Sequence, residues 1–195
     1  MVIGLTGMSC SGKDRVAELL KSECIVVIDE DKLGHEALSA KKDELTDTFG
    51  PDIISEDGTV NRKKLGSIVF SSPEKLEALN RITHPWMVER TLSECKAIED
   101  EGKVAVINAA ILESMGFVEH CDLIIFVYAP YNIRLERAIK RDSISEEGFR
   151  RRSDAQKDIG LKALSSGKRV ITIINDGSDE QLSRQVSLCC ANILK

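Results

Sequence analysis

Short, continuous runs of apolar residues alternate along the chain with longer segments in which apolar residues recur every three or four positions. The short runs predict five strands, at residues 2–6, 24–28, 104–107, 123–128 and 170–174. Because successive rather than alternate positions are apolar, these strands are typical of a parallel sheet that is covered on both faces. The pattern therefore predicts an α/β fold built on a five-stranded parallel sheet.

The longer segments carry signals for helix beginnings. A helix is predicted from Lys13 to Glu23, directly after the first strand. Asn61 and Ser178 are the predicted N-cap residues of two later helices, and Gln181 completes a capping box with Ser178. The residues expected to face the core from the last helix are Leu182, Val186, Cys189 and Ile193.

The lengths of the remaining segments predict three functional parts. Residues 31–102 are too long for one crossover helix and predict a cap of two or three helices. Within it, a lone His84 is more often structural than catalytic, and Pro85 is expected to begin or end a helix. Residues 134–157, rich in Lys and Arg, predict a basic lid, or else only two solvated helix faces. The nucleotide-binding core is expected in residues 1–30, 103–133 and 158–195.

Composition limits the class of protein. Apolar residues make up 42% of the chain and charged residues 30%, values typical of a folded enzyme. The net charge of −5 argues against general nucleic-acid binding, and no apolar run is long enough to span a membrane. The N-terminus lacks a signal-peptide pattern, and the six cysteines lack metal or disulfide spacing. We therefore expect a cytoplasmic protein with reduced, buried thiols, either a monomer or a small homo-oligomer.

The strongest chemical motif follows the first predicted strand. Residues 7–13 match the phosphate-loop pattern G-x-x-x-x-G-K. In such a loop, backbone N–H groups turn towards phosphate oxygens, the following helix adds positive potential, and the lysine reaches the terminal phosphates. The alternative is an incidental glycine-rich turn. The residues expected to bind ATP are Gly7, Met8, Ser9, Cys10, Ser11, Gly12, Lys13 and the adjoining Asp14.

Two positions differ from the usual metal side of a phosphate loop. Asp14 stands where the full motif has Ser or Thr, whose hydroxyl ligates Mg²⁺. A carboxylate is also a hard ligand for Mg²⁺, but without the metal it places a negative charge beside the phosphates. Asn108, after the third strand, stands where many such enzymes carry an Asp for the metal's water shell. Asp14 is thus the candidate magnesium ligand.

Charged residues at two other places fit phosphoryl transfer. Asp29 and Asp31 follow the second strand, at the edge of the sheet where open α/β folds bind ligands. Either can accept a proton from an acceptor hydroxyl or orient hydrated Mg²⁺, whereas the alternative for Asp31 is to cap the next helix. Arg134, Arg137 and Arg141 share one helix face by their spacing, and arginine suits phosphate because its planar fork donates two parallel hydrogen bonds.

Taken together, these features resemble the dephospho-CoA kinase family over nearly the whole chain. The order and spacing of several short motifs carry the resemblance: the phosphate loop, the Asp-x-Asp pair, His84-Pro85, the arginine-rich lid and the turn from Asn175 to Ser178. Two places depart from the family: Asp14, and residues 108–113, where the family usually has Asp-x-Pro-Leu-Leu-x-Glu.

The resemblance implies an enzyme that uses ATP and Mg²⁺ to phosphorylate the 3′-hydroxyl of dephospho-CoA. It implies that Lys13 holds the phosphates, that Arg137 and Arg141 neutralise charge during transfer, and that Asn175 lies near the adenine. Asp31 is the first choice for the base, and Asp29 the second. Two alternatives stay open: a kinase acting on a nucleoside or nucleotide, and a non-catalytic ATP-binding relative whose Asp14 and Asn108 have removed metal-dependent turnover.

Overall fold

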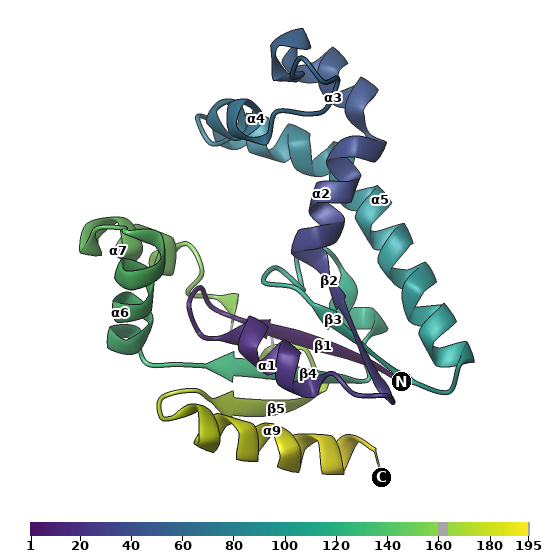
Figure 1. Cartoon of the computed structure of the whole chain (residues 1–195), viewed down its shortest axis with the longest axis vertical. Coiled ribbons are helices and arrows are strands. Elements are labelled where there is room, and N and C mark those ends of the chain that lie inside the picture. The colour runs from purple at the N-terminus through teal and green to yellow at the C-terminus, as the bar shows by residue number, and fades with distance from the viewer. Residues whose placement is uncertain (160–163, 195) are drawn as a thin grey trace. The chain divides into compact units, whose positions relative to one another are not determined.

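The computed structural model describes residues 1–159 and 164–194, and a five-stranded sheet forms its centre (Figure 1). The strands lie in the order β2-β3-β1-β4-β5, and β1 pairs in parallel with β3 and β4, as β4 does with β5. The predicted α/β fold with a parallel sheet is confirmed. The strand bounds are β1 Val2–Gly7, β2 Ile25–Asp29, β3 Val104–Asn108, β4 Leu123–Tyr128 and β5 Arg169–Ile174.

Helices connect these strands. Their bounds are α1 Lys13–Leu20, α2 Glu30–Ala40, α3 Lys42–Phe49, α4 Arg62–Val69, α5 Pro73–Asp100, α6 Tyr131–Asp142, α7 Glu146–Asp154 and α9 Asp179–Ile193, with short 3₁₀ helices η1 Pro51–Ile53 and η2 Phe117–His120. The segment predicted to hold two or three helices thus contains α3, α4, α5 and all of α2 except its first residue. One reason for the larger number is Lys41, whose backbone leaves the helical region and separates α2 from α3. Within the described residues, no helix combines the length and apolar character needed to cross a bilayer.

One face of the sheet packs against α1 and α9, and these two helices also contact each other. Leu5 of β1 and Ile125 of β4 are wholly buried there, together with Val16 of α1. Leu20 is the last residue of α1 in this core, and the polar residues after it are exposed. The helix therefore ends three residues before the predicted Glu23, because burial stabilises a helix only where its apolar face continues.

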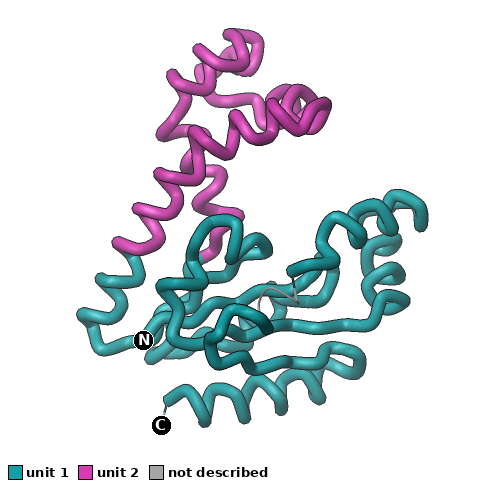
Figure 2. Tube along the Cα trace, turned by 180° about the vertical axis from the view of Figure 1, so that it is seen from behind, with its two compact units in different colours: residues 1–28, 94–195 teal, residues 29–93 magenta. Residues whose placement is uncertain are grey.

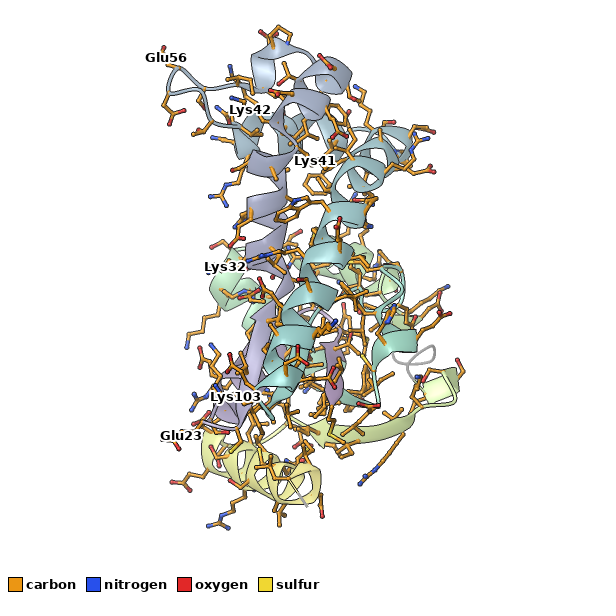
Figure 3. The ribbon with its side chains drawn as sticks, turned by 90° about the vertical axis from the view of Figure 1, so that its right-hand side faces the viewer. Glu23, Lys32, Lys41, Lys42, Glu56 and Lys103 are labelled. Carbon is orange, nitrogen blue, oxygen red and sulfur yellow. The ribbon has the colours of Figure 1, made fainter. Side chains whose placement is uncertain are left out.

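The chain divides into two compact units (Figure 2). Unit 1 comprises residues 1–28 and 94–195, and unit 2 comprises residues 29–93. Unit 2 has an apolar core of its own, formed by Leu45, Ile53, Leu65 and Val69. The predicted core, cap and lid boundaries stay a prediction, since this division follows compactness rather than function. Figure 3 labels three exposed residues of unit 2: Lys32, Lys42 and Glu56.

Pro85 lies inside α5, so the prediction that it begins or ends a helix is wrong. A proline in a helix interior removes one backbone hydrogen bond and crowds the preceding turn, at a cost of about 3 kcal/mol. Burial on both sides offsets this cost, since Thr83 is 5% exposed and Met87 is 8% exposed. The Thr83 hydroxyl also donates a hydrogen bond of 3.0 Å to the Leu79 carbonyl, one turn earlier. Tertiary packing therefore outweighs the local signal of this proline.

The cysteines differ in their burial. None of the six is joined to another by a disulfide bond. Cys95, Cys121 and Cys189 are buried, and burial raises the pKa of the Cys121 thiol to about 12. Cys24 is exposed at the beginning of β2, so the expectation that the thiols are buried is wrong for this residue.

Both predicted N-cap residues are confirmed. The Asn61 side chain accepts a hydrogen bond of 3.0 Å from the Lys64 amide at the beginning of α4. At the beginning of α9, the Ser178 hydroxyl accepts from the Gln181 amide while the Gln181 side chain accepts from the Ser178 amide. These contacts satisfy amides that the helix itself leaves without partners.

We expect Ser178→Ala to lower the free energy of unfolding by about 1 kcal/mol, the usual cost of losing an N-cap. Urea unfolding followed by circular dichroism measures the loss. Ser187→Ala is the matched control, because Ser187 lies inside the same helix and only donates back to the Ser183 carbonyl. Equal losses for the two variants would contradict the importance of the capping box.

Candidate functional site

The phosphate loop joins the end of β1 to the beginning of α1 and contains two residues in the left-handed backbone region. These are Cys10, with φ 62°, and Gly12, with φ 90°. Two features exclude a side chain at Gly12. Its positive φ disfavours any residue with a Cβ, and a Cβ at this position would lie 2.0 Å from Asn175 Nδ2. A Cβ on Gly7 would lie 2.6 Å from the Val127 carbonyl oxygen. Both glycines of the motif are thus required by conformation or by close packing.

A bracket formed by Arg137 and Asn175 holds this loop from outside. Asn175, which follows β5 and is 7% exposed, donates from Nδ2 to the Ser11 carbonyl at 2.8 Å. Arg137 of α6 donates from Nη1 to the carbonyls of Cys10 and Ser11, both at 3.3 Å. Its Nη2 donates to the Asn175 carbonyl and to Asn175 Oδ1, both at 3.2 Å. The bracket neutralises loop carbonyls that would otherwise repel phosphate.

The three arginines on one face of α6 have different partners. Arg134 is 4% exposed and donates to the Ala129 carbonyl at 3.2 Å and to Ser153 Oγ of α7 at 3.2 Å. Its guanidinium carbon lies 5.7 Å from the centre of the Phe149 ring, and burial lowers its pKa. Arg134 therefore joins α6 to α7, and its Nη1 also donates to the Ser9 carbonyl of the phosphate loop at 3.4 Å.

Arg141 lies near the end of α6 and is exposed. Its Nε donates to Asp142 Oδ1 at 2.7 Å, and Arg152 of α7 donates to Asp142 Oδ2 at 2.6 Å. Hydrogen bonds from these two arginines hold the pKa of Asp142 far below its usual range. The charge of Arg141 also helps to lower the pKa of Asp14. Arg137 and Arg141 are the two arginines predicted to neutralise phosphate charge. The Arg137 guanidinium donates to loop carbonyls, whereas that of Arg141 donates to Asp142.

Lys13, Asp14 and Asn108 form one polar cluster at the beginning of α1. Lys13 Nζ donates to Asp14 Oδ1 at 2.9 Å and to Asn108 Oδ1, and Asn108 Nδ2 donates to Asp14 Oδ1 at 3.3 Å. The Lys13 side chain is 11% exposed and that of Asp14 is 69% exposed. Burial raises the pKa of Asp14, but the hydrogen bonds from Lys13 and Asn108 and the charge of Lys13 outweigh it and leave the pKa below its usual value.

The cluster has the donor chemistry that Mg²⁺ prefers. Asp14 supplies carboxylate oxygens and Asn108 an amide oxygen, both hard ligands. Within the described residues, no group of three or more His, Cys, Asp or Glu side chains could hold a metal by itself. Magnesium commonly takes one or two protein oxygens and completes its shell with substrate phosphates and water. The residues present therefore fit Mg²⁺ that arrives together with ATP.

Gln156 makes a contact to the loop that sequence reasoning did not predict. The Ser9 amide donates to Gln156 Oε1 at 2.7 Å, and Gln156 lies just after α7. The side-chain oxygen of Gln156 thus accepts a hydrogen bond from a loop N–H group that is expected to bind phosphate. The resemblance placed Gln156 in the lid, but its partner could not be predicted because it lies 147 residues away in the sequence.

A cavity of about 210 Å³ lies beside the loop. Its walls come from Thr6 at the end of β1, residues 110–114 and Val118 after β3, and, after α7, Ala155, Gln156, Asp158 and Ile159. Two of these lining residues, Glu113 and Asp158, are acidic. Because carboxylates repel phosphate and accept hydrogen bonds, this cavity suits hydroxyl groups better than phosphate.

Asp29 and Asp31 lie in unit 2 and have different environments. Asp29 Oδ1 accepts hydrogen bonds from the Asp31 amide at 3.0 Å and from the Lys32 amide at 3.3 Å, so Asp29 is the N-cap of α2. The capping role that the sequence left open for Asp31 therefore belongs to Asp29. Asp31 is in the first turn of α2, exposed. His84, in α5, is half-buried, and burial lowers its pKa.

Comparisons with known proteins all point to one family. A family model described as dephospho-CoA kinase matches residues 1–181. A dephospho-CoA kinase of Corynebacterium glutamicum is 35% identical over 198 residues, which cover 98% of this chain and 96% of the relative. A dephospho-CoA kinase of Aquifex aeolicus is 37% identical over 187 residues, which cover 94% and 93%.

Solved structures resemble the chain over nearly its whole length. A Thermus thermophilus protein has a TM-score of 0.80 and 32% identity, covering 99% of this chain and 97% of that chain. A dephospho-CoA kinase from Campylobacter jejuni has a TM-score of 0.76 and 25% identity, covering 98% and 96%.

We expect Arg137→Ala to weaken ATP binding about 10- to 100-fold, because the loop loses charge-assisted hydrogen bonds worth about 1.5–3 kcal/mol. Arg137→Lys keeps the positive charge but lacks the planar guanidinium that binds several carbonyls at once. It should therefore restore little ATP affinity if Arg137 acts by holding the loop. Calorimetry measures ATP affinity, with Arg150→Ala on the exposed face of α7 as control. Full rescue by lysine would instead show that Arg137 acts through its charge.

Proposed function

The chain belongs to the dephospho-CoA kinase family, and from this premise we propose how its own residues transfer the γ-phosphoryl group of ATP to the 3′-hydroxyl of dephospho-CoA. The reaction gives CoA and ADP, and both substrates are small molecules. The observation that carries the proposal is the phosphate loop, whose carbonyls are bound by Arg137 and Asn175 and whose lysine lies at its end. A cytoplasmic location and a monomeric or small homo-oligomeric state stay predictions.

Lys13 and the loop amides hold the phosphates. Helix α1 makes its first backbone bond from the Val16 amide to the Gly12 carbonyl, so the amides that precede Val16 have no partner within the helix. These amides and the positive end of the helix attract the phosphate chain. The Lys13 ammonium then exchanges Asp14 and Asn108 for phosphate oxygens, to which its charge is better matched.

Arg141 neutralises negative charge that develops in transfer, and we assign Arg137 a positioning role in place of the charge-neutralising role expected from the sequence. Arg137 already binds the carbonyls of Cys10 and Ser11, which fixes its guanidinium under the loop. Among the described residues, Arg141 donates to Asp142 at the surface, and such contacts contribute little free energy. Exchanging Asp142 for a phosphate oxygen is therefore inexpensive.

Asp31 accepts the proton of the acceptor hydroxyl. As the oxygen attacks the γ-phosphorus, its proton moves to the Asp31 carboxylate, and the bond to the bridging oxygen breaks with its electron pair going to ADP. Asp29 is less suited, because its Oδ1 accepts two amide hydrogen bonds at the beginning of α2. The cavity beside the loop, with its hydroxyl-binding walls, is the proposed place for the sugar of the acceptor.

Mg²⁺ is the proposed metal, with Asp14 and Asn108 as its protein donors. When bound, the ion neutralises charge on the β- and γ-phosphates and stabilises the leaving oxygen. Without it, the Asp14 carboxylate is a negative charge beside a triphosphate. Asn175, which the resemblance places near the adenine, contacts the Ser11 carbonyl here and supports the loop.

An assay of ADP release with ATP, Mg²⁺ and dephospho-CoA tests this function directly. Nucleosides and nucleoside monophosphates, supplied as acceptors in parallel, test for the alternative kinase. ATP binding without ADP release for any acceptor would contradict the proposal and favour a non-catalytic relative.

We expect Lys13→Ala to weaken ATP binding or turnover about 10- to 100-fold while the fold stays intact, since a charged hydrogen bond contributes about 1.5–3 kcal/mol. Calorimetry and the ADP-release assay measure the two effects. Lys21→Ala, at the other end of α1, is the matched control. Unchanged ATP affinity and unchanged turnover in Lys13→Ala would contradict the assignment of residues 7–13 as a phosphate loop.

We expect Asp31→Asn to retain ATP binding and to lower kcat by roughly 10²-fold or more, the usual contribution of a general base. Asp29→Asn is the control, because asparagine is an equally good N-cap and keeps α2 intact. The comparison of kcat between the two variants is decisive. Full turnover in Asp31→Asn, together with a loss in Asp29→Asn, would reverse the order of the pair.

A further inference from the structure

Asp14 and Asn108 are 94 residues apart in sequence but belong to one hydrogen-bonded cluster. Each is unusual by itself for a phosphate-loop enzyme. In the general arrangement, a neutral hydroxyl on the helix after the loop and a carboxylate from a neighbouring strand hold Mg²⁺. Here the helix carries the carboxylate, and the strand carries the neutral oxygen.

We infer that Asp14 and Asn108 have exchanged these two roles and act as one coupled ligand pair for the divalent cation that accompanies ATP. The inference rests on the proposed function and states how the two metal donors of that same site depend on each other. The carboxylate of Asp14 compensates for the carboxylate that is absent at Asn108, so the two unusual residues together keep the ability to bind the metal.

The hydrogen bonds support the coupling. Asn108 Nδ2 donates to Asp14 Oδ1, which orients the carboxylate, and Lys13 Nζ donates to both Asp14 Oδ1 and Asn108 Oδ1. One ammonium thus contacts an oxygen atom from each residue, so both oxygens face the same cationic group. When Lys13 turns to the phosphates, both oxygens become available at the same place.

The charge balance supports an exchange as well. The usual pair and the pair in this chain each contribute one carboxylate and one neutral hard oxygen, so the net charge around the metal is the same. An Asp at both positions would place two carboxylates side by side next to a triphosphate, which Coulomb repulsion disfavours. Neutral residues at both positions would leave the metal without a charged protein ligand.

Four proteins test the inference: the unaltered chain, Asp14→Ser, Asn108→Asp and the double variant. The measured quantity is ATP affinity with Mg²⁺, obtained by calorimetry and repeated in excess chelator. With Mg²⁺, each single variant should bind ATP about tenfold more weakly: Asp14→Ser because the metal loses its carboxylate, and Asn108→Asp because a second carboxylate adds repulsion. The double variant should return to within about threefold of the unaltered chain, whereas independent effects would add to a loss of about a hundredfold.

A second measurement reports on the metal itself. The electron paramagnetic resonance spectrum of Mn²⁺ bound with ATP should change in each single variant, because the ligands change. Glu18→Gln, which removes an exposed carboxylate from the same helix, is the matched control and should leave affinity and spectrum unchanged. Thermal unfolding of all variants establishes that they are folded.

The outcomes separate this inference from the proposed function. If the effects of the single variants simply add in the double variant, or if chelation weakens all four proteins equally, the exchange is wrong, even where ATP binding and turnover are normal. If the unaltered chain does not bind ATP at all, the phosphate-loop assignment itself is wrong. Recovery in the double variant, with a changed Mn²⁺ spectrum in each single variant, establishes the exchange.

Discussion

The candidate site depends on a constraint that lies outside the phosphate-binding surface: the loop has to keep Cys10 and Gly12 in the left-handed backbone region. Such a conformation persists only where surrounding contacts specify it. The bracket of Arg137 and Asn175 provides these contacts through hydrogen bonds to the Cys10 and Ser11 carbonyls. Because the two residues come from α6 and from the end of β5, the loop is held by the folded core and not by its own sequence.

The same constraint explains why arginines on one helix face have different roles. Arg134 is buried between α6 and α7, Arg137 is fixed under the loop, and Arg141 is exposed beside Asp142. Each step towards the end of α6 brings the guanidinium further from the protein core. A guanidinium with protein partners on all sides positions its neighbours, whereas one with exposed partners can exchange them for phosphate.

Most of the fold could be predicted from the chain, because its signals are local. Continuous apolar runs predicted the parallel sheet, and Asn61 and Ser178 cap the helices expected of them. The errors arose where packing outweighs local preference. Pro85 lies inside α5, where Thr83 and Met87 on either side of it are buried, and α1 ends early because its apolar face ends at Leu20.

For the site, the sequence by itself determined the phosphate loop, because the spacing of Gly7, Gly12 and Lys13 is a local requirement of backbone conformation and charge. Only the tertiary structure decided which distant side chains meet that loop. Periodicity shows which residues share a helix face but not what lies opposite that face. The contacts of Asn108 with Asp14 and of Gln156 with Ser9 therefore could not be predicted, since each joins segments about a hundred residues or more apart through the packing of the sheet.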